Sequence, residues 1–288
     1  MSGNSKSFDF NHATVWVTGA SSGIGAAFAV ESVRRGARVI LSARREEKLQ
    51  EVRQHCLNAG AREEAVLVQP LDVADEAAMP AAVANVLARF GRIDLLLNNA
   101  GMSQRSLCVD TDMSVYRKMI NVDLLGQIAL TKQVLPVMVR QGSGILSVTS
   151  SVAGKVGAPL RTAYCAAKHG VMGFFDALRV EVAHLGLNVT TIVPGSIRTE
   201  VGRNALTGSG EPINKVDPAI EAGMDVDDCA RVIADGFASG VEELAVGTGP
   251  EMQLLEMKRK DPTATFRLLE QWTLELLQGK TPHLNKEP

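Results

Sequence analysis

Residues 14–35 read TVWVTGASSGIGAAFAVESVRR, and this stretch decides the fold. Residues 14–17 predict a short buried strand, the three glycines of residues 18–25 predict a tight turn, and residues 26–35 have a helical pattern. A dinucleotide site needs this context, because glycines let the backbone approach a pyrophosphate and a helix N-terminus offers free N–H groups. The alternative is an ordinary strand-to-helix loop with no ligand.

The same unit recurs along the chain at intervals of roughly 30 residues, which predicts a βαβ series and a parallel sheet. Ligand groups in such sheets lie beyond the carboxyl ends of the strands. The glycine turn, Arg44, Asp72 and residues 98–101 are therefore expected on one rim. The further strands are expected at 37–43, 65–70, 93–97, 144–149, 188–193 and 243–247. The further helices are expected at 44–60, 75–90, 112–140 and 226–239, and another helix continues from the stretch that ends at Lys168 to about Leu185.

A second informative stretch is Ser147 to Gly173, SVTSSVAGKVGAPLRTAYCAAKHGVMG. Tyr164 and Lys168 stand four residues apart, so on a helix they share one face. A nearby ammonium favours the phenolate by about 3 kcal/mol, which is most of what a tyrosine needs to carry protons near neutrality. Ser151 is placed to hold a substrate oxygen. The alternative is a half-buried ring beside a solvated ammonium.

Composition narrows the class of protein. The 288 residues are 45% hydrophobic and 22% charged, which is ordinary globular composition. A net charge of -2 gives no reason to expect nucleic acid or an acidic membrane as a partner. The four cysteines are far apart, which predicts reduced thiols and no metal site. Without a signal peptide or an apolar run near ~18 residues, the expected location is cytoplasmic, with no membrane partner.

The chain is expected to form one domain with two appendages. Residues 1–12 are predicted as a flexible tail, 13–250 as the domain, and 251–288 as a C-terminal helical extension. Residues 200–223 are rich in Gly, Pro and charges and are interpreted as a mobile lid over the substrate. The extension has Phe266, Leu269, Trp272 and Leu276 on one stripe, which fits a subunit contact, a pocket wall or ordinary packing.

Several motifs stand in one order: TGASSGIG at 18–25, NNAG at 98–101, Asn121, Ser151, Tyr164 with Lys168, and PG at 194–195. Residues 13–250 thereby resemble the short-chain dehydrogenase/reductase family. The resemblance implies a single Rossmann-like, doubly wound parallel sheet of about seven strands, with helices on both faces. It also implies an enzyme that transfers hydride reversibly between a nicotinamide and a carbonyl or secondary alcohol, as a homodimer or homotetramer.

The resemblance also implies a role for individual residues. Tyr164 would be the general acid/base, Lys168 would lower its pKa and hold the nicotinamide ribose, Ser151 would orient the carbonyl, and Asn121 would keep a water in the proton relay. Asp72 and Val73 would bracket the adenine. The full set of expected cofactor contacts is Gly19, Ser21, Ser22, Gly23, Ile24, Gly25, Ser42, Arg44, Asp72, Val73, Asn98, Ala100, Gly101, Tyr164, Lys168, Pro194, Gly195, Ile197 and Thr199.

The end of the second strand favours NADP over NAD. Enzymes of this architecture that use NAD tend to carry an acid there, whereas this chain reads VILSA at 39–43 and continues with Arg44 and Arg45. A guanidinium can bind a 2′-phosphate, and Ser42 adds a hydroxyl. The alternatives are that both arginines are solvated or that they pair with Glu46 and Glu47.

Two other functions are alternatives to this enzyme. The first is a cofactor-binding regulator or scaffold without turnover. The intact serine, tyrosine and lysine set argues against it, because a protein that only senses the cofactor needs no proton relay. A sugar-nucleotide epimerase or dehydratase fits poorly, since no separate substrate domain is visible. The substrate itself is not readable, although the mixture of Met, Val, Leu and Ile in the candidate pocket segments hints at a lipophilic carbonyl. Those segments are Met102–Arg105, Val152–Leu160 and residues 200–224, which stand near the cations Lys155 and Arg161.

Overall fold

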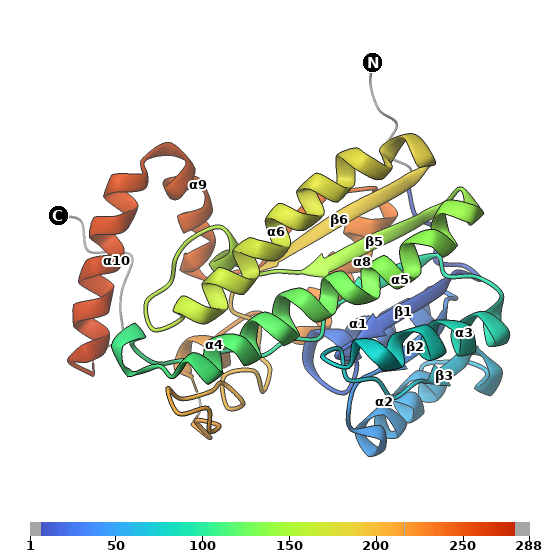
Figure 1. The fold of residues 1–288 in the computed structure, drawn as a ribbon, viewed down its shortest axis with the longest axis horizontal. Coiled ribbons are helices and arrows are strands. Elements are labelled where there is room, and N and C mark those ends of the chain that lie inside the picture. Colours follow the sequence, from blue (N-terminus) through green and yellow to red (C-terminus); the bar gives the residue numbers. More distant parts are fainter. Residues whose placement is uncertain (1–6, 216, 280–288) are drawn as a thin grey trace.

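The computed structural model describes residues 7–215 and 217–279, and a seven-stranded parallel sheet forms its centre (Figure 1). The strand order is β3-β2-β1-β4-β5-β6-β7, with the chain crossing over after β3. This confirms the doubly wound parallel sheet of about seven strands. The strands are β1 Thr14–Thr18, β2 Arg38–Ser42, β3 Val66–Val68, β4 Leu95–Asn98, β5 Gly144–Thr149, β6 Leu187–Pro194 and β7 Glu243–Val246.

Helices cover both faces of the sheet, and each face has its own apolar core. Alternate strand residues point to opposite faces, so Val15 and Val17 enter one core while Trp16 enters the other. α1 (Gly23–Arg34), α2 (Glu46–Asn58) and α8 (Val226–Ala238) cover the first core. α3 (Met79–Phe90), α5 (Gly126–Gln141) and α6 (Thr162–Val182) cover the second.

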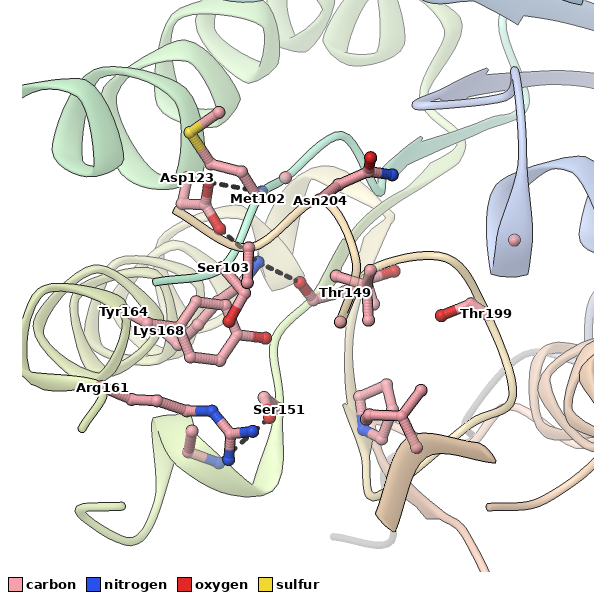
Figure 2. Close-up of a pocket in the computed structure, with 18 of the residues that line it drawn as sticks. Met102, Ser103, Asp123, Thr149, Ser151, Arg161, Tyr164, Lys168, Thr199 and Asn204 are labelled. Carbon is pink, nitrogen blue, oxygen red and sulfur yellow. Dashed lines mark hydrogen bonds and ion pairs between the residues drawn. The ribbon is translucent and has the colours of Figure 1, made fainter. Parts of the chain in front are cut away.

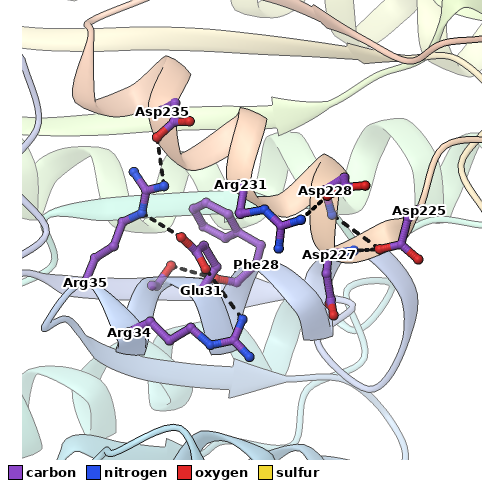
Figure 3. Close-up of polar contacts among 10 residues, drawn as sticks. Phe28, Glu31, Arg34, Arg35, Asp225, Asp227, Asp228, Arg231 and Asp235 are labelled. Atoms are coloured by element: carbon purple, nitrogen blue, oxygen red, sulfur yellow. Dashed lines mark hydrogen bonds and ion pairs between the residues drawn. The ribbon is translucent and has the colours of Figure 1, made fainter.

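The contact between α1 and α8 combines a buried aromatic pair with surface ion pairs, and Figure 3 shows the ion pairs. Phe28 of α1 packs on Phe237 of α8 with ring centroids 5.6 Å apart. Arg35, just after α1, donates to both Glu31 and Asp235 at 2.8 Å and so links the two helices. Asp225 caps the N-terminus of α8 by accepting from the N–H groups of Asp227 and Asp228.

The helix predicted over residues 112–140 is present but is interrupted. α4 (Met113–Ile120) and α5 are joined by a π-helical segment, Asn121–Leu125. The expectation that no apolar run approaches a membrane span is wrong here. Helix Met113–Gln141 is long and apolar enough to cross a membrane by length and composition, and 44% of its most apolar window is buried in the fold.

The structure also describes parts of the predicted tail, the predicted extension and segment 200–223. Residues 1–6 of the predicted tail lie outside the described residues. Later residues of that tail pack on the domain: Phe10 is buried in the core, and the Phe8 N–H donates to the Phe237 carbonyl. The extension forms two helices, α9 (Gln253–Lys260) and α10 (Pro262–Leu277), and its residues 280–288 lie outside the described part. In the described residues of segment 200–223, the one helix is the short α7 (Pro218–Glu221).

All four cysteines are free thiols, as expected from their spacing. Cys56, Cys165 and Cys229 are buried and Cys108 is exposed. Burial raises the pKa of the Cys56 and Cys229 thiols to about 12, so both are small apolar core residues near neutral pH.

Candidate active site

A cavity of about 730 Å³ opens beyond the carboxyl ends of the strands. It extends from the glycine turn after β1, past the loops that follow β4 and β5, to the C-terminal helices α9 and α10. The cavity brings together most of the residues expected from the sequence. Those on its wall are Gly19, Ser21, Ser22, Gly23, Ile24, Arg44, Asp72, Val73, Ala100, Gly101, Ser151, Tyr164, Lys168, Pro194, Gly195, Ile197 and Thr199.

The glycine turn is packed so closely that only glycine fits. Gly19 has φ 64°, and a Cβ there would lie 2.7 Å from the Ala100 Cα. A Cβ on Gly25 would lie 2.5 Å from the Asn99 side-chain nitrogen. The Thr18 hydroxyl accepts hydrogen bonds from the N–H groups of Asn99 and Ala100, both at 3.0 Å. The turn after β1 is therefore fixed to the loop after β4.

The N-terminus of α1 faces this cavity with unsatisfied donors. Ser22 occupies the N-cap position, but its side chain makes no capping hydrogen bond, and no acidic residue stands in the first turn. Ser21, Ser22, Gly23 and Ile24 all line the cavity. Free N–H groups and the positive end of a helix dipole form an anion site, so the turn fits a dinucleotide pyrophosphate.

Tyr164 and Lys168 lie on the cavity face of α6, and Ser151 lies opposite them after β5. Figure 2 shows the Tyr164 hydroxyl directed into the cavity on the side where Ser151 lies. The Lys168 ammonium lies 5.7 Å from the Tyr164 ring centroid. Ser151 Oγ accepts a hydrogen bond from the Ala153 N–H at 3.1 Å, which fixes its position. All three side chains line the same cavity.

Lys168 is almost completely buried, with a side-chain exposure of 4%. Its Nζ donates to the Thr149 carbonyl at 3.0 Å and lies 3.3 Å from Oδ2 of Asp123 (Figure 2). The Asp123 side chain is fully buried, and its Oδ1 accepts from the Met102 N–H at 2.9 Å. Burial raises the pKa of Asp123, while the Lys168 charge and the Met102 N–H oppose that rise.

The structure corrects the expected place of Asn121. Asn121 is exposed and lies off the cavity wall as the described residues define it, whereas Asp123 lines the cavity beside Lys168. The π-helical segment that begins at Asn121 carries Asp123 inward. Asp123 was missed from the sequence, yet it is the sole acid between residues 113 and 141. A lone acid in an apolar helical pattern is the signal that points to it.

Three other expected cofactor residues have positions inside the fold rather than on the cavity wall formed by the described residues. Ser42 is buried, where its hydroxyl accepts from the Trp16 indole N–H at 2.8 Å and donates to the Gln69 carbonyl at 2.7 Å. Asn98 is buried and donates to the Thr131 hydroxyl and the Ser147 carbonyl. Gly25 leaves room for the Asn99 side chain, because a Cβ at this position would collide with it.

Residues 200–223, the predicted lid segment, and the extension also line the cavity. Arg161 lies 3.3 Å from Asp217 of the lid segment, and Arg105 binds the same carboxylate, so both arginines at this end are paired. Lys155 instead pairs with Glu243 at the surface. Apolar side chains of the extension cover the opening; they are Leu254, Leu269, Trp272 and Leu276. Phe266, the fourth member of the predicted stripe, is exposed.

This geometry defines a class: a doubly wound α/β protein with a dinucleotide turn and a tyrosine–lysine pair in one cavity. The short chain dehydrogenase family model matches residues 13–209. The chain is 38% identical to the human protein "Dehydrogenase/reductase SDR family member 7" over 265 residues, which are 91% of this chain and 78% of the relative.

Two solved structures support the same class of protein. A levodione reductase structure superimposes with a TM-score of 0.76 at 29% identity, covering 84% of this chain and 99% of that chain. A metagenomic short-chain oxidoreductase in complex with NADP gives a TM-score of 0.68 at 29% identity, covering 82% and 98%. The chain belongs to the short-chain dehydrogenase/reductase family, and it is an oxidoreductase that acts on CH–OH or C=O groups.

The expected cytoplasmic location is wrong, because the comparisons with related proteins do not support it. The relatives include the human and mouse family member 7 proteins, at 38% and 36% identity. In addition, helix Met113–Gln141 is long and apolar enough to cross a membrane by length and composition.

The position of Ser42 leads to a prediction about stability. Ser42→Ala removes the acceptor of the buried Trp16 N–H, which should lower the free energy of unfolding by about 1–3 kcal/mol. Because Ser42 is buried at the end of β2 and lies off the cavity wall formed by the described residues, the dissociation constant for NADPH should stay within about twofold of the parent value. Urea unfolding and a cofactor titration measure the two quantities. A large loss of NADPH affinity at unchanged stability would contradict this placement.

Proposed function

We propose that this chain is an NADP(H)-dependent carbonyl reductase and alcohol dehydrogenase, with Tyr164 as the general acid/base. The observation that carries the proposal is that Tyr164, Lys168 and Ser151 share one cavity with the glycine turn and the uncapped N-terminus of α1. Bound nicotinamide supplies or accepts the hydride. The protein then has to orient the carbonyl and move one proton.

Each residue of the set has a distinct task. Ser151, held by the Ala153 N–H, donates its hydroxyl hydrogen to the substrate oxygen and orients it. Tyr164 gives its proton to that oxygen in reduction and takes it back in oxidation. The buried Lys168 ammonium lies 5.7 Å from the Tyr164 ring centroid, where a positive charge stabilises the negative charge that develops on the phenol oxygen during proton transfer.

The preference for NADP rests on the chain's own residues, since similar solved structures hold either NADP or NAD. Arg44 and Arg45 both line the cavity after β2, and Ala43 beside them leaves room for a 2′-phosphate. Arg45 reaches the Ser21 hydroxyl at 3.5 Å, which keeps a cation next to the glycine turn. Charge-assisted bonds from a guanidinium to phosphate favour NADP at this position.

A lipophilic substrate of medium size suits the other end of the cavity. Side chains from three regions of the chain converge there: Val152 and Val156 after β5, Leu206 of the lid segment, and Trp272 of α10. Arg105 and Arg161, which also line the cavity, are already paired with Asp217, and Lys155 is paired with Glu243. An aldehyde or ketone with an apolar body is therefore the proposed substrate class.

Tyr164→Phe tests the proton carrier. The variant should fold and bind cofactor within a few-fold of the parent, yet lose about 10²–10⁴ in turnover, because only the hydroxyl is removed. Absorbance of the reduced cofactor with a panel of carbonyls and alcohols measures the loss. Tyr116→Phe, which removes the other tyrosine of the chain, is the matched control and should keep its turnover. Comparable turnover in Tyr164→Phe would instead favour a non-catalytic, cofactor-binding regulator.

Arg44→Ala tests cofactor choice. The dissociation constant for NADPH should rise by about one to two decades and that for NADH should barely change, because only NADPH carries the 2′-phosphate. Fluorescence titration of the free protein measures both constants. The control is Arg53→Ala, which removes an arginine of α2 that pairs with Glu63. Equal weakening of both cofactors, or a parent that prefers NADH, would refute the assignment.

A homodimer or homotetramer is proposed from the long helices. Large apolar side chains are exposed along them: Met113, Leu125 and Val139 on the α4–α5 helix and Val180 on α6. Apolar helix faces of this kind pack across two-fold axes in symmetric oligomers. Light scattering at micromolar concentration should give at least twice the chain mass of 30.7 kDa, and a monomeric mass would contradict the proposal.

A further inference from the structure

The buried carboxylate of Asp123 has no part in the mechanism above, yet it touches the group on which that mechanism depends. Its Oδ1 accepts from the Met102 N–H at 2.9 Å, and its Oδ2 lies 3.3 Å from Lys168 Nζ. Oδ2 makes no hydrogen bond within the described residues, so the contact with Lys168 is an ion pair. A buried charge needs such a partner, because burial penalises an unpaired ion heavily.

Among the described residues, Lys168 is the one cation that forms an ion pair with Asp123. The segment Asn121–Leu125 contacts α4, α5 and α6. Of the cations on these helices, Lys168 is the one that acts on Asp123. α4 carries the exposed Arg117 and Lys118, of which Lys118 also lines the cavity. α5 carries the buried, neutral Gln127, and α6 carries Lys168 and Tyr164. Across the cavity, Arg105 and Arg161 are compensated by Asp217.

Asp123 is also close enough to Tyr164 for its charge to matter. Lys168 Nζ lies 5.7 Å from the Tyr164 ring centroid and 3.3 Å from Oδ2, so the carboxylate is within roughly 9 Å of the ring. A cation alone would stabilise the phenolate strongly, whereas an anion behind that cation cancels part of the effect. The balance between the two charges therefore decides how readily Tyr164 ionises.

We propose that Asp123 is a positioning residue: its carboxylate holds Lys168 against the Thr149 carbonyl and, by offsetting the ammonium charge, sets the pH at which Tyr164 ionises. The inference rests on the proposed role of Tyr164, but its central prediction concerns the ionisation itself. Replacing the carboxylate with a neutral group leaves the ammonium uncompensated. The phenolate then becomes more stable, and the titration of Tyr164 moves to lower pH.

The composition of the chain makes this titration directly observable. Tyr116 and Tyr164 are the only two tyrosines in the sequence. In a Tyr116→Phe background, the ultraviolet difference spectrum of tyrosinate formation therefore reports Tyr164 alone. The measurement uses the full chain without cofactor or substrate, so it does not depend on turnover.

Asp123→Asn in this background should lower the titration midpoint of Tyr164 by about one pH unit. The introduced amide keeps an oxygen for the Met102 N–H, so the shift reports the lost charge. The matched control is Asp227→Asn, which removes an exposed charge on α8 and should leave the midpoint unchanged. If Asp123→Asn does not fold, Asp123→Ser is the second neutral variant, with the same expected direction.

A midpoint that stays constant or rises in a folded neutral variant would overturn the proposal. With an accepted substrate, the pH profile of the oxidation rate should shift by the same amount and in the same direction. Failure of the proposed function is distinguished by Tyr164→Phe: if that variant keeps its turnover, Tyr164 is not the proton carrier, whatever the spectroscopic midpoint shows.

Discussion

The buried ammonium of Lys168 is the interaction on which the rest of the site depends. It joins three parts of the chain, since it donates to the Thr149 carbonyl at the end of β5, pairs with Asp123 in the π-helical segment, and belongs to α6. Removal of one partner of such a pair typically costs about 3–5 kcal/mol, because the other charge stays buried. The same contacts that make the burial tolerable also aim Lys168 at the Tyr164 ring.

The parallel sheet sets the second constraint. Because all seven strands run the same way, their carboxyl ends bring the turn after β1, the loop after β4 and the serine after β5 to one rim. Thr18 then ties the first two of these together by accepting from Asn99 and Ala100. The extension and residues 200–223 add further walls to the same cavity.

Much of the fold was predictable from the sequence because its signals are local. The strands end within a few residues of their predicted limits, and the glycine turn, Tyr164, Lys168 and Ser151 all reach the cavity. Periodicity fails at Asn121, however, because a π-helical segment changes the helical phase there and carries Asp123 inward instead. The periodicity of apolar residues also carries no information about contacts between distant parts of the chain. The Trp16–Ser42 hydrogen bond and the Asp217 contacts with Arg105 and Arg161 were therefore not predictable.

Transfer of an isotopic label tests the central claim most directly. The chain is incubated with NADPH that carries deuterium at the transferable nicotinamide position, together with any carbonyl it accepts, and the product is analysed by mass spectrometry and NMR. We predict one deuterium on the carbinol carbon, a primary isotope effect on turnover, and a hydroxyl proton that comes from solvent. Product alcohol without deuterium at that carbon would contradict hydride transfer in this cavity.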